Sequence, residues 1–205
     1  KRVIATVRAI KKLLFFRPEN VAELVDEMVR LAEVARRDGI LALENQSKAI
    51  SNPFIAMGIQ MAVDGIKPET VEEVMRTEIR AMQGRHAEGK KVMETIGRCG
   101  PAFGLVATLL GLILMLGNLS NAETIGPSMA MALIGTLYGV ATANFFAIPM
   151  AEKLACLSHE EAMIKEIAVR GVMAIQSGDS PRIVRQKLST FLPPRLRANL
   201  REGAA

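Results

Sequence analysis

The sequence contains few aromatic residues and few cysteines. Aromatic residues make up 4% of the 205 residues, and there is no tryptophan, so side chains on which unpaired bases could stack are scarce. The two cysteines, Cys99 and Cys156, lack the spacing of zinc ligands, and we interpret them as reduced thiols. There is also no nucleophile–base set and no phosphate-binding GxxxxGK(S/T) loop. These absences argue against a nucleic-acid-binding protein, a metal centre and an enzyme.

Charge is missing from two long stretches of the chain. Residues 99–122 and 124–151 contain no Asp, Glu, Lys, Arg or His. The mean hydropathy is accordingly +0.23, although 23% of the residues are charged. A helix needs about 20 apolar residues to cross a bilayer, so we predict membrane helices over 101–119 and 127–150. A short loop near 120–126 would join them into a transmembrane hairpin.

The basic residues indicate how this hairpin is oriented. All 26 Lys and Arg residues lie in 1–100 or 151–205, and none lies in the hairpin. Cytoplasmic segments of membrane proteins carry an excess of Lys and Arg. We therefore predict a multi-pass protein of the bacterial inner membrane, with both flanks in the cytoplasm and the loop in the periplasm. The net charge of +5 then needs no nucleic acid to explain it.

Both flanks show helical patterns. Apolar residues recur at helical spacing from Val21 to Ala32, and Asn52 before Pro53 is typical of a helix start. The predicted helices cover about 18–38, 40–50, 53–64, 68–98, 151–177 and 183–191. No segment alternates like a strand. The predicted fold class is all-α, an integral membrane protein with a cytoplasmic helical domain over 1–100, the hairpin over 101–150, and C-terminal cytoplasmic helices and a tail over 151–205.

Small residues recur at spacings of three and four in both predicted membrane helices. Gly104 and Gly111 do so in the first, and Gly135 and Gly139 form a GxxxG in the second. Small residues let helix backbones approach closely in a membrane. We predict that these four glycines lie on faces packed against other helices.

Two threonines, Thr108 and Thr136, lie on the same faces. They either bond back to carbonyls of their own helices, as threonines in membrane helices often do, or present hydroxyls to a water-filled pathway. The ionisable groups that usually mark ion pathways are missing from both spans. A protein that conducts ions through this hairpin would therefore take its carboxylate from another segment or from another protein.

Two prolines lie at the edges of the charge-free stretches. Pro101 is expected to start its helix, because proline is favoured in the first turn. Pro149 lies inside a helical pattern, so we expect it to bend or locally open its helix.

The sequence as a whole resembles a known family. Segments 101–112 and 125–139 are similar to the last two membrane helices of the MotA/PomA flagellar stator subunits, which belong to the MotA/TolQ/ExbB superfamily. Further similar segments are 35–44, 63–65, 85–86 and 174–178. Family members have two more membrane helices ahead of this region, so we expect these to be missing from this chain.

The resemblance implies a mechanism. Family members are homo-oligomers of five subunits around a MotB/PomB partner, whose membrane helix carries the ion-binding aspartate. Ion flow, of sodium or protons, is coupled to torque on the rotor protein FliG. No cofactor is implied beyond the transported ion. The missing carboxylate of the hairpin is consistent with this division of labour.

The resemblance also implies roles for particular residues. Arg36, Arg37 and Glu44 match charges that face the rotor, whereas Asn45 stands at a position that is acidic in sodium-type relatives. In the same way, Pro101 and Pro149 match prolines linked to torque generation, and Thr108 and Thr136 match threonines close to the ion path. From the residues alone, two arginines at a helix C-terminus could equally serve the helix dipole.

Two other functions remain open at this point. An ExbB/TolQ-type ion-driven energy transducer of the cell envelope would share a similar hairpin. A membrane scaffold without ion coupling would tolerate the loss of both threonine hydroxyls.

Overall fold

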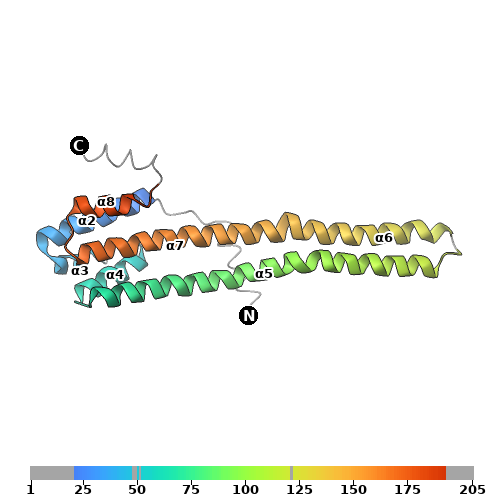
Figure 1. Ribbon diagram of the computed structural model, residues 1–205, viewed down its shortest axis with the longest axis horizontal. Coiled ribbons are helices and arrows are strands. Elements are labelled where there is room, and N and C mark those ends of the chain that lie inside the picture. Colours follow the sequence, from blue (N-terminus) through green and yellow to red (C-terminus); the bar gives the residue numbers. More distant parts are fainter. Residues whose placement is uncertain (1–20, 48–49, 51, 121, 193–205) are drawn as a thin grey trace. The chain divides into compact units, whose positions relative to one another are not determined.

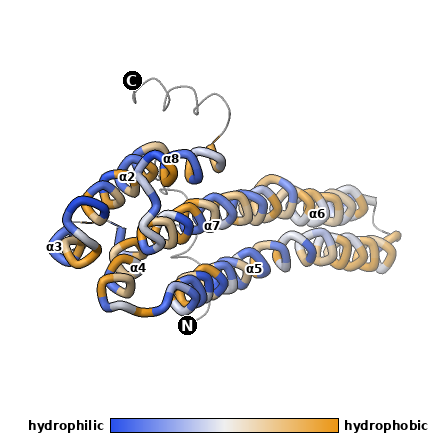
Figure 2. The backbone as a smooth tube through the Cα atoms, turned by 60° about the vertical axis from the view of Figure 1, so that its left-hand side comes forward, coloured by the Kyte–Doolittle hydropathy of each residue, from blue (hydrophilic) through white to orange (hydrophobic). Residues whose placement is uncertain are grey.

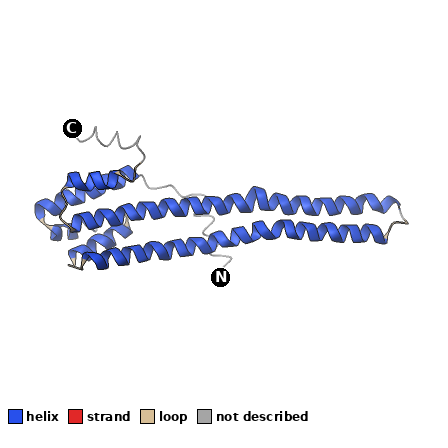
Figure 3. Ribbon diagram, viewed as in Figure 1, coloured by secondary structure: helices blue, strands red, loops and turns tan. Residues whose placement is uncertain are grey.

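Every element that the structure describes is a helix. The computed structural model describes residues 21–47, 50, 52–120 and 122–192, and those ranges contain no strand (Figure 3). The elements in chain order are α2 (Val21–Asp38), η1 (Ile40–Ala42), α3 (Leu43–Ser47), α4 (Pro53–Val63), α5 (Pro68–Gly117), α6 (Ala122–Ala141), η2 (Thr142–Ala147), α7 (Ile148–Gln176) and α8 (Pro181–Ser189). The predicted all-α class is confirmed. The predicted helix start at 18–20 and the tail after 192 lie outside the described residues.

The chain folds as two compact units. In the described ranges, unit 1 comprises residues 84–158 and unit 2 comprises residues 21–83 and 159–192. Helices α5 and α7 each contribute to both units (Figure 1). The predicted domain boundaries after residues 100 and 150 therefore fall inside continuous helices, because they mark a change of composition and not an end of packing.

Unit 2 contains the larger hydrophobic core. Met28 of α2, Ile55 of α4, Met75 of α5 and Ile167 of α7 are fully buried in it. Gly58 lets α4 lie close to α5, because a Cβ there would stand 2.7 Å from the Met75 side chain. The amphipathic spacing of these helices thus produces one shared core.

Local signals set the helix ends of unit 2. Asn52 caps α4, since its side-chain oxygen accepts a hydrogen bond from the Phe54 N–H at 3.0 Å. Gly39 and Gly65 have positive φ angles of 86° and 73°, which glycine adopts without a steric penalty. The helix predicted over 40–50 is instead a 3-10 turn, η1, followed by the short α3.

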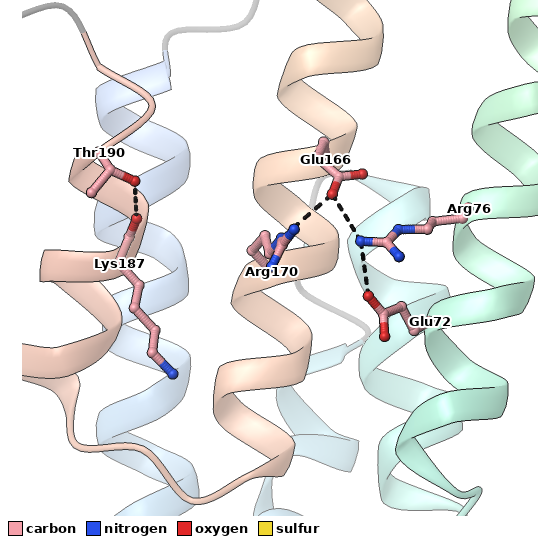
Figure 4. A network of polar contacts seen from close by, with 6 residues as sticks. All are labelled: Glu72, Arg76, Glu166, Arg170, Lys187 and Thr190. Carbon is pink, nitrogen blue, oxygen red and sulfur yellow. Dashed lines mark hydrogen bonds and ion pairs between the residues drawn. The ribbon is translucent and has the colours of Figure 1, made fainter.

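Charged side chains also join α5 to α7 within unit 2. Arg76 of α5 contacts Glu72 at 2.9 Å and Glu166 of α7 at 3.2 Å, and Glu166 also pairs with Arg170 at 3.4 Å (Figure 4). All four side chains are partly exposed, so each pair adds little stability. Their main effect is to fix the register of the two helices.

Unit 1 is built from α5, α6, η2 and the start of α7. Two of its helical segments, one in α5 and one beginning in α6, are long and apolar enough to cross a membrane. Figure 2 shows hydrophobic residues concentrated along α6 and the C-terminal part of α5. Where these helices become polar, His86 of α5 hydrogen-bonds Ser158 of α7 at 3.1 Å.

The hairpin differs from the prediction in two places. Helix α5 passes through Pro101 without ending, so Pro101 does not start a helix. Helix α6 already begins at Ala122 and includes Pro127, so the predicted loop near 120–126 is wrong and the turn lies at residues 118–120. Each proline removes one backbone donor, and the rest of the helix outweighs that loss.

Candidate functional site

Helices α5 and α6 meet along a seam of small residues in unit 1. A Cβ at Gly139 would lie 2.5 Å from the Gly100 carbonyl oxygen, and one at Gly104 would lie 3.1 Å from the Thr136 Cα. At such distances the two backbones touch. No side chain larger than hydrogen fits at Gly139 without moving the helices apart.

The seam continues towards the turn of the hairpin. A Cβ at Gly111 would lie 2.5 Å from the Ala132 Cβ, and one at Gly135 would lie 2.5 Å from the Ala107 Cβ. The four glycines singled out in the sequence therefore all lie at this contact. Sequence reasoning missed Gly100, although it stands four residues before Gly104.

The two threonines come together at the middle of the seam. Their side-chain hydroxyls contact each other across the helices. The Thr108 hydroxyl also lies 3.1 Å from the Gly104 carbonyl of its own helix and 3.2 Å from the Ala132 carbonyl of α6. The Thr136 hydroxyl lies 3.3 Å from the same Gly104 carbonyl. Both alternatives left open by the sequence thus meet in one cluster, since the hydroxyls bond to their own helix and also face each other.

This cluster offers oxygen atoms and no formal charge. Two hydroxyls and two carbonyls, those of Gly104 and Ala132, converge between half-buried side chains. Oxygen ligands of this kind suit hydrogen-bonded water or a hard monovalent cation. Because the two hydroxyls have only two protons to share, the cluster retains oxygen lone pairs that accept.

The prolines lie next to irregular backbone. Pro149 follows η2, a segment in which the Ile148 N–H donates to the Ala143 carbonyl, five residues back, instead of four. The helix is thus locally opened just before Pro149, as the sequence indicated. Pro101 lies beside Gly100, where a Cβ would stand 3.4 Å from the Ala143 Cβ of η2. Both irregularities therefore occur at one level of unit 1.

The candidate rotor-facing charges lie in unit 2, at the end of α2 and the start of α3. Arg36, Arg37 and Glu44 are all exposed. Arg37 also binds its neighbour Asp38, with its Nε 3.0 Å from Oδ1 and its Nη2 2.8 Å from Oδ2. This hydrogen bond and charge lower the pKa of Asp38 below its usual range and raise the pKa of Arg37. Both groups are therefore charged at neutral pH, and swimming between pH 6 and 8 should not depend on their titration.

The described residues offer no metal centre. Among them, no three His, Cys, Asp or Glu side chains are grouped as metal ligands. The chemistry available in unit 1 is therefore that of hydroxyls and carbonyls, and in unit 2 that of exposed charges.

Comparison with known proteins identifies the family. Residues 46–167 match the profile of the MotA/TolQ/ExbB proton channel family. Motility protein A of Borreliella burgdorferi is 41% identical over 201 residues, which cover 95% of this chain and 77% of the relative. Chemotaxis protein PomA of Vibrio alginolyticus is 35% identical over 181 residues, which cover 88% of this chain and 71% of the relative.

A solved structure is similar over the same region. In the flagellar MotAB stator complex from Bacillus subtilis, one chain matches with a TM-score of 0.89 and 30% sequence identity, covering 98% of this chain and 79% of that chain. The curated relatives are named as motility proteins, which favours a flagellar stator over an ExbB/TolQ-type transducer. The chain belongs to the MotA/TolQ/ExbB proton channel family, and within it to the non-enzymatic stator subunits of the bacterial flagellar motor.

Proposed function

We propose that this chain joins a MotB/PomB-type partner to form an ion channel that drives the flagellar rotor. The solved relative is a MotAB complex, and neither apolar stretch of this chain contains a carboxylate. The ion-binding aspartate of the channel would therefore come from the partner. The observation that carries this proposal is the hydroxyl contact between Thr108 and Thr136, which supplies uncharged oxygen beside the place that such a carboxylate would occupy.

The proposal includes an arrangement in the membrane. The subunits form a homo-oligomer, a ring of five, in the bacterial inner membrane. The turn at residues 118–120 faces the periplasm, and the basic flanks face the cytoplasm. Arg36, Arg37 and Glu44 contact the rotor protein FliG there. No cofactor enters the proposal besides the transported ion.

Removing the two hydroxyls tests the ion path. We expect Thr108→Val with Thr136→Val to reduce swimming speed at least tenfold in a host that lacks its own stator subunit. Valine keeps the shape of threonine, so the seam should still close while the oxygen ligands are lost. The measurement is swimming speed, together with the amount of chain in the membrane.

Serine provides the matched control for this prediction. Thr108→Ser with Thr136→Ser keeps both hydroxyls and should keep most of the swimming speed. Full speed in the valine variant would contradict the proposed ion path and would favour a scaffold without ion coupling.

The identity of the ion can be tested separately. Hydroxyl and carbonyl oxygens suit sodium, so we expect swimming speed to rise with sodium concentration at a fixed proton gradient. The measurement uses the wild-type chain with its partner. A speed that does not change with sodium would identify protons as the driving ion.

A further inference from the structure

Segment η2 brings one face of the second helix into line. Gly139, Ala143, Ala147 and Ala151 are spaced four residues apart, and the three alanines are at most 3% exposed. In a regular α-helix, twelve residues would turn this face by about 120° past whole turns. Within η2 the bonds run over five residues, so about one residue is absorbed, and with it about 100° of that drift. Figure 1 shows the widened turn between α6 and α7.

The proline next to η2 makes two backbone patterns nearly equal in hydrogen bonds. After the bond from Ile148 to Ala143, the next donor in the wide pattern would be Pro149, which has no N–H, so the Asn144 carbonyl loses its partner. In a regular α-helix, Pro149 would instead leave the Phe145 carbonyl without a partner. Each pattern lacks one bond, so exchanging them costs no additional bond at this point.

The surface opposite η2 is smooth. A Cβ at Gly97 would lie 3.7 Å from the Ala147 Cβ, and one at Gly100 would lie 3.4 Å from the Ala143 Cβ. Glycines and alanines at these contacts offer no interlocking side chains. One helix can therefore turn against the other here with little steric resistance.

We propose that η2 is a rotary joint, at which exchange between the wide and the regular pattern turns α6, with Thr136, against α5. Complete exchange would turn α6 by about 100°, the angle of one helical residue. The turn would separate the Thr136 hydroxyl from the Thr108 hydroxyl and so change the oxygen cluster. The proposal rests on the proposed function, because it supplies the step between ion binding and movement.

Deleting Asn144 tests the joint. The deletion removes the one residue that η2 absorbs, so it should give a regular helix in which Thr136 still faces Thr108. We expect swimming speed to fall at least tenfold while the amount of chain in the membrane is unchanged. Asn144→Ala is the matched control, because its side chain only bonds the Val140 carbonyl of its own helix at 2.9 Å. This variant keeps the residue count and should swim normally.

A cross-link shows whether the seam survives the deletion. With Cys99 and Cys156 replaced by serine, Thr108→Cys and Thr136→Cys should form a disulfide in the full complex, both with and without Asn144. Loss of the cross-link on deletion would overturn the proposal, because η2 would not be absorbing a residue. Fast swimming of the deletion variant with the cross-link retained would overturn it too. Failure of the wild-type chain to restore swimming would instead contradict the proposed function.

Discussion

Gly139→Val is expected to abolish swimming and to destabilise the hairpin. The new Cβ alone would meet the Gly100 carbonyl oxygen at 2.5 Å and the Gly104 Cα at 3.0 Å. Both neighbours are backbone atoms, which cannot rotate away like the end of a side chain. Overpacking of this kind costs about 1–3 kcal/mol, and here we expect the upper end. The measurements are swimming speed and the thermal unfolding of the purified complex.

The control for this prediction lies in the same helix. Gly126 has no atom within 4 Å of its Cβ position, so Gly126→Val adds the same side chain without a collision and should leave both measurements near wild type. If Gly139→Val swims and unfolds like wild type, the close contact between α5 and α6 is not required.

The second large effect is expected on the cytoplasmic side. Arg36→Glu combined with Arg37→Glu should reduce swimming speed at least tenfold, because the charges proposed to contact the rotor are reversed. The protein should still fold, since both side chains are exposed and the Arg37 side chain is 77% accessible. The unfavourable effect on the dipole of α2 amounts to only about 0.3–1 kcal/mol per residue. Speed and membrane level are measured together.

A reversed charge elsewhere separates contact from net charge. Arg182 is exposed on α8 in the same unit, and Arg182→Glu should swim normally. Reversing acidic residues on the rotor should partly restore the double variant. Normal swimming of the double variant, with an unchanged rotor, would exclude Arg36 and Arg37 from the rotor contact.

The helices could largely be predicted because their signals are local. The capping of α4 by Asn52 and the end of α2 before Gly39 depend on residues next to each other. Continuation of α5 through Pro101 could not be predicted in this way. It depends on the packing of Gly100 and Gly104 against α6, which lies far away in the sequence and offsets one lost hydrogen bond.

The candidate site was predictable in its residues but not in its geometry. Spacing placed Thr108 and Thr136 on small-residue faces, but only the register of the hairpin makes their hydroxyls touch. Segment η2 left a signal that sequence reasoning missed. The repeated spacing of four from Gly139 to Ala151 is too long for one side of a regular α-helix, and it indicates an absorbed residue.

The uninterrupted course of α5 has a mechanical consequence. Its 50 residues form a rod about 75 Å long, at about 1.5 Å per residue. If such a rod tilts as a whole by about 5°, one end moves by about 6 Å relative to the other, roughly the pitch of one helical turn. A small change where the rod crosses the bilayer can thus become a stroke of useful length at its far end, with no ion travelling there.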